Sequence, residues 1–276
     1  MQRPEVHTMI AWISFVMNNP GNDIAKWEKA AAAAETLLNT GYTLNNDYQS
    51  TFVTDNNEII FARYFTQANY HETHKFNGRN GDSGWGGSCP SQNLVDDYEM
   101  INGELPYTDA SQTTVNPESG YDPANPYVNR DPRFYASILY DGAIWMNRET
   151  ETFAGGLDSR GSSIASWNAT LTGYYFKKFL DESIPPVGSS TQSTSPWIFF
   201  RYAEILLNLA EAKFEIGDEV SARNYLNMVR NRTSVNMPEV TATGEALRNR
   251  IRHERRIELA LENHRFFDVR RWKIAI

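Results

Sequence analysis

The C-terminal stretch from Pro196 to Trp272 constrains the fold of this chain most strongly. It contains PWIFFRYAEILLNLAEAKFEIGDEVSARNYLNMVRNRT and, further on, RNRIRHERRIELALENHRFFDVRRW. Apolar residues recur every three or four positions, which is the period of a helix with one buried face. Gly217 stands where the first helix would end, and Asp218 stands where it could cap the second. The stretch therefore predicts a helix hairpin followed by a long helix rich in Arg and Glu.

The spacing also predicts which side chains of this stretch face inward. The expected faces are Tyr202, Ile205, Leu206 and Leu209 on the first helix, and Val220, Tyr225, Leu226 and Val229 on the second. We also expect Phe199, Tyr202, Phe266 and Trp272 in the core. Opposite charges three or four residues apart stabilise a helix, so we expect the Arg and Glu ladder from Arg250 to Arg265 to be structural. Asp268, Arg270 and Arg271 should fix the end of the chain in the same way.

The N-terminal part predicts further helices and one strand. Met9–Met17 is apolar and short, which favours a buried helix over a membrane span. Asn22 or Asp23 could cap a helix over Ile24–Asn39, which Gly41 would end. The alanine run from residue 30 to 34 within it predicts close packing against another helix, and Glu58–Phe65 predicts a short strand.

The middle of the chain is mostly irregular. A short helix is expected from Ser91 to Gly103, and mixtures of aromatic and branched residues at Arg133–Asp141 and Gly173–Leu180 favour strands. Three polar regions rich in Gly, Asn, Ser and Pro separate these elements: Thr66–Ser88, Glu104–Arg130 and Asn147–Ala165. Loops of this length in a compact domain usually carry function.

Composition and charge exclude several classes of function. The 276 residues include 26 Lys and Arg against 34 Asp and Glu, a net charge of −8. Nucleic-acid binding depends on clustered cations, so the balance argues against it. Cys89 is the single cysteine, which rules out a disulfide within the chain and is most simply an incidental thiol.

Motifs for catalysis or metal binding are weak. The sequence has no Gly-x-Ser-x-Gly elbow and no phosphate-binding loop with its lysine. His71 and His74 are three residues apart in an expected loop, whereas a zinc protease places its two histidines four apart on a helix, so we expect solvated histidines. We expect no catalytic residue, no metal and no cofactor. The pair of acids in a glycoside hydrolase is brought together by the fold, so a secreted hydrolase stays an alternative.

Aromatic residues in the expected loops are the better lead. Sugar rings present C–H faces that stack on Trp and Tyr, while nearby amides and charged groups bind the hydroxyls. Trp85 lies among Gly84, Gly86 and Gly87, so no adjacent side chain is expected to pack against its indole. The candidate ligand-binding residues are Trp85, Tyr70, Asn69, Trp145, Trp167 and Tyr127.

Several segments in order resemble the SusD/RagB family of outer-membrane nutrient-binding lipoproteins. They are the C-terminal stretch, the opening MIAWISFVMNNPGNDIAKWEKAAAAAETLLNTGYTLNNDY, and then NEIIFAR, PSQNLVDDYEMING, NPYVNRDPRFYASILYDGAIW and TGYYFKKFL. Together they cover nearly the whole chain, and the set is specific although each piece alone is weak.

The resemblance implies a mainly α fold: a tetratricopeptide-like helix-hairpin scaffold with long irregular loop insertions and a few short strands. One domain, residues 1–276, would comprise a helix hairpin and strand (1–65), a loop-rich ligand-binding region (66–195) and C-terminal helices (196–276). We interpret the sequence as one such domain.

The resemblance also implies a function. The chain would bind a glycan at the outer-membrane surface without cutting it, and would pass it to a SusC-like TonB-dependent transporter. Members normally begin with a signal, a lipidated Cys and further helices, and we expect this chain to lack them. The alternatives are a tetratricopeptide-type module that binds a protein or peptide, a secreted glycoside hydrolase and, within the family, a peptide ligand.

Overall fold

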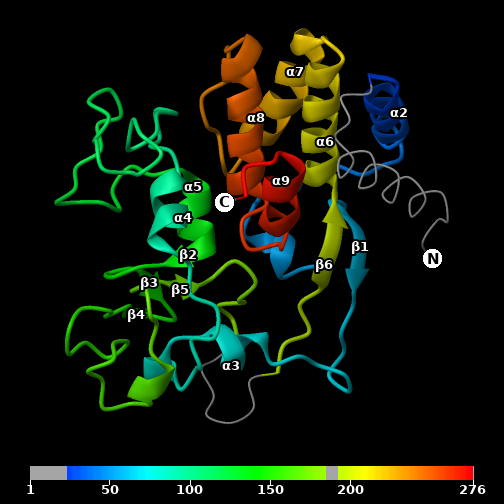
Figure 1. Cartoon of the computed structure of the whole chain (residues 1–276). Helices are drawn as coiled ribbons and strands as arrows, with labels where there is room; N and C mark the ends of the chain where they lie inside the picture. Colours follow the sequence, from blue (N-terminus) through cyan, green and yellow to red (C-terminus); the bar gives the residue numbers. More distant parts are fainter. Residues whose placement is uncertain (1–23, 185–191, 276) are drawn as a thin grey trace. The chain divides into compact units, whose positions relative to one another are not determined.

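A computed structural model describes residues 24–184 and 192–275 (Figure 1). The helix expected over Met9–Met17 and the caps Asn22 and Asp23 lie outside these residues. The described chain divides into two compact units. The first consists of residues 24–47, 56–62 and 198–275, and the second of residues 48–55 and 63–197.

The first unit is built mainly of helices. Strands β1 and β6 form a two-stranded sheet beside them. Its elements are α2 (Ile24–Glu35), β1 (Ile59–Arg63), β6 (Trp197–Arg201), α6 (Tyr202–Glu215), α7 (Glu219–Arg230), α8 (Gly244–Glu258) and α9 (Arg265–Arg271). The strand expected over Glu58–Phe65 is confirmed as β1. The helix expected to reach Asn39 ends as a regular helix at Glu35 and continues as turns to Gly41.

Helix α6 is the centre of the first unit, because α2, α7 and α8 all pack against it. Its side chains are buried on almost every face from Tyr202 to Ala212. Ala30, Ala31 and Ala34 of α2 are buried in one core cluster with Leu209. Small side chains let two helix backbones approach closely, so the packing predicted from the alanine run is confirmed.

The predicted inward face is confirmed for α6 and partly wrong for α7. Leu226 and Val229 of α7 are fully buried, but Val220 is 63% exposed. Ala222 takes the inward position instead. Asp218 caps α7 by accepting a hydrogen bond from the Ser221 N–H at 3.0 Å, as predicted.

The expected long C-terminal helix is two helices, α8 and α9. Leu261 and Asn263 between them have φ of 66° and 68°, a left-handed conformation that a helix cannot continue through. Tyr202 and Trp272 are buried as predicted, whereas Phe199 and Phe266 are exposed, so that part of the core prediction was wrong. Spacing alone did not reveal which face of the short α9 is covered.

The charged ladder is structural, and several of its residues pair with side chains on other elements of the first unit. Arg201 Nη1 lies 2.7 Å from both Glu58 Oε1 and Glu258 Oε1, and Arg201 Nη2 lies 2.7 Å from Glu262 Oε1. Arg232 adds contacts of 2.6 Å to Glu58 and 2.9 Å to Glu258. Burial disfavours the charge of Arg201, but the carboxylates of Glu262, Glu258 and Glu58 raise its pKa well above the ordinary value. Arg201 therefore stays charged inside the protein.

The second unit has few regular elements and long connecting loops. Its pairs β2–β5 and β3–β4 are short antiparallel ribbons. Its helices are α3 (Thr73–Asn77), α4 (Gln92–Asp97) and α5 (Pro132–Ser137), with 3-10 turns η1 (Ser50–Phe52), η2 (Asn80–Asp82) and η3 (Ser166–Asn168). Its strands are β2 (Ile138–Leu139), β3 (Ile144–Trp145), β4 (Arg148–Glu149) and β5 (Tyr175–Phe176). The expected mainly α fold with a few short strands is confirmed.

Two predictions for the second unit need correction. The segment expected as a strand from Arg133 begins with helix α5, because Pro132 is preorganised for a first helical turn and the Asp131 carboxylate accepts from the Arg133 N–H at 2.8 Å. Its β part is confined to Ile138–Leu139. The helix expected from Ser91 to Gly103 spans Gln92–Asp97, with Ser91 as its cap.

Candidate ligand-binding surface

The glycine-rich loop around Trp85 folds back on α3 of the second unit. The Trp85 N–H donates to the Lys75 carbonyl at 2.8 Å, and the Gly87 N–H donates to the Phe76 carbonyl at 2.7 Å. A Cβ at Gly84 would lie 2.3 Å from the Gly78 carbonyl, so the backbones approach too closely for any side chain there. The glycines thus allow the loop that contains Trp85 to pack closely against α3.

Trp85 is 48% exposed. The sequence suggested that no side chain packs against its indole, but two side chains do. Its ring meets Phe76 edge to face, with centroids 5.2 Å apart. The Lys75 Nζ lies 5.0 Å from the centroid of the indole. Because α3 places Lys75 and Phe76 beside the returning loop, the three side chains form one partly exposed group, and the prediction that the indole lacks a local partner was wrong.

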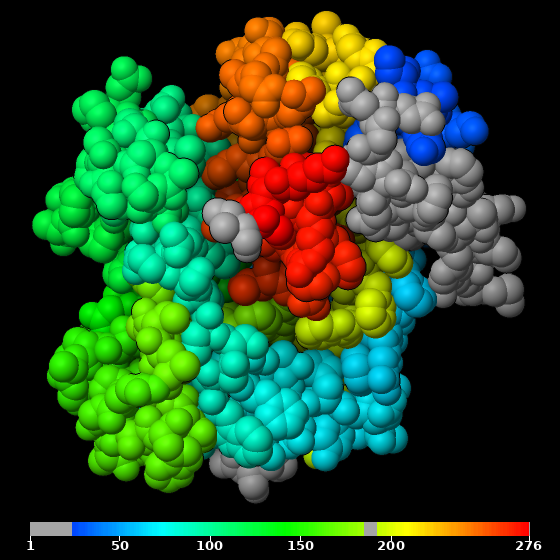
Figure 2. Space-filling model, in the orientation of Figure 1, coloured from blue at the N-terminus to red at the C-terminus, as the bar shows by residue number. Residues whose placement is uncertain are grey.

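Trp167 stands on turn η3 in the loop between β4 and β5, with 84% of its surface exposed. It makes no ring contact in the described part of the chain. The next residue, Asn168, places its carbonyl against Gly86, where an added Cβ would lie 2.4 Å from that oxygen. The backbones of Gly86 and Asn168 are therefore in contact, and Trp85 and Trp167 are the residues that directly precede them. Figure 2 shows the cyan and green atoms of these two loops side by side at the surface.

Asn69 closes a turn through a bridge with Thr66, and Tyr70 is the next residue. Both are exposed, with Tyr70 at 39%. No hydrogen bond or ring contact of the described residues joins them to Trp85. The structure therefore leaves their predicted role in binding as a prediction.

The other two candidates are packed into the second unit. Trp145 is 2% exposed, and the Lys177 Nζ lies 5.5 Å from its ring centroid. Tyr127 belongs to an aromatic cluster with Phe134 and Tyr140, at centroid distances of 6.0 and 4.4 Å. Neither ring is as exposed as those of Trp85 and Trp167, and the predicted role of Trp145 and Tyr127 in binding stays a prediction.

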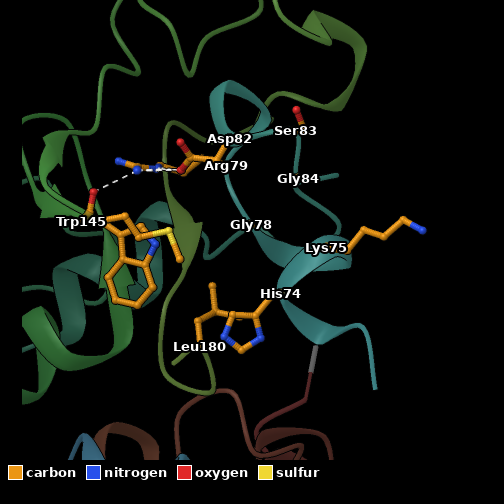
Figure 3. A pocket seen from close by; sticks show the side chains of 10 residues that line it. His74, Lys75, Gly78, Arg79, Asp82, Ser83, Gly84, Trp145 and Leu180 are labelled. Atoms are coloured by element: carbon orange, nitrogen blue, oxygen red, sulfur yellow. Dashed lines mark hydrogen bonds and ion pairs between the residues drawn. The ribbon is translucent and has the colours of Figure 1, made fainter. Parts of the chain in front are cut away.

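A hollow lies beside the Trp85 loop within the second unit (Figure 3). It holds about 350 Å³ of empty space, part of it open to solvent. Trp145 and Leu180 provide apolar walls, while the Lys75 side chain points away from the hollow in Figure 3. Its lining residues are His74, Lys75, Gly78, Arg79, Asp82, Ser83, Gly84, Trp145, Met146 and Leu180.

One wall of the hollow is held rigidly by a buried arginine. Arg79 donates from Nε to Asp82 Oδ2 at 2.7 Å and from Nη2 to the Trp145 carbonyl at 3.0 Å. Arg148 holds the same Asp82 at 2.8 Å. Both arginines form ion pairs with the Asp82 carboxylate. Asp82 therefore has a structural role, because it connects the loop of Trp85 to Arg148 on β4.

The two histidines are tied to backbone groups, so the prediction of solvated loop histidines was wrong. The Asp181 N–H donates to Nε2 of His74 at 2.6 Å, and His71 Nε2 lies 3.0 Å from the Ser195 carbonyl. Burial lowers the pKa of His71, and it lowers the pKa of His74 to about 4. Both imidazoles are therefore neutral at pH 7. Among residues 24–184 and 192–275, no cluster of three or more His, Cys, Asp or Glu could hold a metal ion.

Comparison with known proteins identifies the family to which this chain belongs. The model of the SusD family matches residues 38–276. The chain belongs to the SusD family. A SusD-like protein of Bacteroides fragilis has 34% identity and a TM-score of 0.73, over 90% of this chain and 51% of that one. A SusD-like carbohydrate-binding protein of the same species has 31% identity and a TM-score of 0.76, over 90% and 49%.

A curated relative agrees with this assignment over a shorter stretch. SusD-like protein P2 of Formosa agariphila is 40% identical over an alignment of 93 residues, and the match covers 30% of this chain and 18% of that protein. This SusD-family chain therefore matches about half the length of its solved relatives and a smaller part of its curated ones. Within the described residues, no helix has both the length and the apolarity to cross a membrane.

Proposed function

We propose that this chain binds an oligosaccharide or polysaccharide without cutting it. The observation that carries the proposal is the pair of exposed indoles, Trp85 and Trp167, on two touching loops of a SusD-family chain. Exposed tryptophan supplies a large, flat face with little loss of conformational freedom on binding, which suits stacking on sugar rings. A solved relative is a carbohydrate-binding protein by its own description, which supports the same class of ligand.

The surroundings of Trp85 support binding in preference to catalysis. Glu72 and Asp82 belong to the same loop region as Trp85, and both pair with cations. Lys75 Nζ lies 3.2 Å from Glu72, and Arg79 and Arg148 hold Asp82. A carboxylate that already pairs with a cation is not free to donate a proton to a bound sugar. The geometry favours a platform for a sugar chain.

Membership of the SusD family supports a proposal for the place and the partner of this binding. We propose that the protein acts at the outer face of a bacterial outer membrane and passes its glycan to a SusC-like TonB-dependent transporter. Purification from outer-membrane extracts should recover such a transporter together with the protein. Recovery of the protein alone, at salt concentrations that preserve known transporter complexes, would contradict this part of the proposal.

The binding proposal is tested by affinity electrophoresis against starch, xylan, galactomannan, pectin and laminarin. We expect retarded migration in one of these polysaccharides and no release of shorter sugars, measured by chromatography of the same mixture. Release of short products would support the hydrolase alternative. Binding to none of the five, with binding to a peptide library, would support a peptide ligand and contradict the proposal.

A further inference from the structure

The loops that carry Trp85 and Trp167 meet at a contact that admits no side chain. Gly86 has φ of 51°, and a Cβ there would lie 2.4 Å from the Asn168 carbonyl and 3.2 Å from the Tyr175 ring. Cβ atoms do not approach a carbonyl oxygen that closely, and a left-handed φ also favours glycine. Any larger residue at position 86 would push the two loops apart.

The buried Tyr175 side chain forms hydrogen bonds with both of these loops. The Tyr175 hydroxyl, on a fully buried side chain, lies 2.5 Å from Asn80 Oδ1 and 2.7 Å from the Asp158 carbonyl. It also accepts a hydrogen bond from the Thr170 N–H at 3.1 Å. Burial raises the pKa of Tyr175 to about 12, so the hydroxyl keeps its proton for donation.

Asn80 completes the connection between the loops. Its Nδ2 donates to the Ile164 carbonyl at 2.8 Å and to the Leu157 carbonyl at 3.3 Å. Asn80 belongs to the loop of Trp85, while both carbonyls belong to the loop of Trp167. In Figure 1 the teal and green turns of these loops lie next to each other. Side chains thus hold together two loops that share no sheet.

We propose that Gly86, Asn80 and Tyr175 are positioning residues that fix the separation of Trp85 and Trp167, so that the two indoles bind one sugar chain together. This inference rests on the proposed glycan-binding function. Two sites on a rigid frame raise affinity for a ligand that spans both, because the second contact forms at a high effective concentration. The protein would therefore select for chain length, binding a chain that reaches both indoles much more tightly than one that reaches a single indole.

The test uses oligosaccharides of two, four, six and eight units prepared from whichever of the five polysaccharides the wild type binds. In the wild type, the ratio of eight-unit to two-unit affinity should be roughly tenfold or more. Gly86→Ala and Tyr175→Phe should each reduce this ratio to about threefold or less. Tyr175→Phe keeps the ring and removes the hydroxyl, so it tests the proposal even where Gly86→Ala fails to fold.

Gly142→Ala is the matched control. Gly142 has φ of 84°, and a Cβ there would meet nothing within 4 Å, so the variant carries the backbone strain without separating loops. It should keep the wild-type ratio. A ratio that survives in both positioning variants would overturn the proposal, as would an equal loss of affinity at every chain length, because a general loss of structure has no preference for long chains.

A second readout separates this inference from the function on which it rests. Trp167→Ala should lower affinity for the eight-unit chain about fivefold in the wild type and less than twofold in the Gly86→Ala background. The same fivefold loss in both backgrounds would contradict the positioning role and leave the glycan function standing. No effect of either tryptophan on binding would contradict the proposed site, and the inference with it.

Discussion

The two units of this protein bury arginine side chains for different purposes. In the first, buried Arg201 and Arg232 face the carboxylates of Glu58 and Glu258. In the second, buried Arg130 donates to the carbonyls of Val95, Tyr98 and Pro126 at 2.6 to 2.8 Å. The first unit has helices that satisfy their own backbones, so its arginines join elements by charge. The second has few helices and strands, so Arg130 takes the place of missing backbone partners there. Arg79 does both, because it pairs with Asp82 and donates to the Trp145 carbonyl.

This difference explains how an irregular region can be rigid enough to hold a binding surface. A buried carbonyl without a partner costs about 1–3 kcal/mol, and one guanidinium offers five donors in a fixed plane. Arg79, Asn80 and Tyr175 supply such bonds along the loops that carry Trp85 and Trp167. Side-chain hydrogen bonds to the backbone thus hold the loops of the second unit together, whereas packing between helices holds the first unit together.

The largest effect should come from breaking the charge network of the first unit. Arg201→Met removes the cation that Glu58, Glu258 and Glu262 share and leaves Arg232 as a cation for the first two. This should lower the free energy of unfolding by about 4 kcal/mol. Hydrogen exchange of the α6 amides measures it. Arg248→Met, which removes a partly exposed pairing with Glu215 and Glu245, should cost less than about 1 kcal/mol. Equal losses in the two variants would contradict the role given to the network.

The next effect tests the corrected face of α7. Leu226→Ala removes a fully buried side chain from the core around α6 and should cost about 3 kcal/mol of unfolding free energy. Val220→Ala on the same helix should stay within about 0.5 kcal/mol, because Val220 is mostly exposed. Denaturant unfolding curves of the two variants measure the difference. A larger cost at position 220 would restore the face that the sequence suggested.

The two units should also respond to acid at different pH. His74 has its pKa lowered to about 4 by burial, so between pH 6.5 and 4 the unfolded chain binds a proton that the folded chain does not. Stability of the second unit should therefore fall by roughly 2 kcal/mol from pH 7 to 5. Exchange of amides in residues 71–87 measures this fall, and His74→Gln should make it smaller. An unchanged slope in His74→Gln would contradict the assignment.

The first unit should resist acid over that range. Burial would raise the pKa values of Glu211 and Asp268, but the guanidiniums of Arg271 and Arg255 outweigh it and lower both. A carboxyl with a lowered pKa stabilises the fold above its unfolded pKa and loses that contribution as the pH falls through the folded value. Loss of α6 and α9 protection should therefore begin below about pH 4. Loss of this protection between pH 7 and 5 would contradict the prediction that the two units respond to acid at different pH.

Local patterns predicted the first unit better than the second for a physical reason. The apolar spacing of α6, the turn at Gly217 and the alanine run in α2 depend on neighbours within one or two helical turns. The packing of the Trp85 loop against Asn168 joins residues far apart in sequence, and no periodicity signals it. The sequence therefore indicated that Trp85 and Trp167 were candidates, but it could not show that their loops touch or that Trp145 is buried.

Some of the missed features left signals in the sequence. Asp131-Pro132 begins a helix, since a capping carboxylate precedes a proline with the right φ, yet the aromatic residues that follow favoured a strand. Tyr175 and Asn80, in contrast, look like ordinary polar residues of a strand and a loop. Their roles are visible once the loops that they connect lie together.

The most direct test of the account is calorimetric titration of the wild type, Trp85→Ala and Phe267→Ala with the polysaccharide identified by electrophoresis. Phe267 is 55% exposed in the first unit, so it controls for the loss of an exposed aromatic side chain. Trp85→Ala should weaken binding about fivefold without changing thermal stability, and Phe267→Ala should leave binding unchanged. Unchanged affinity in Trp85→Ala, or equal weakening in both variants, would contradict the placement of the glycan on the loops of the second unit.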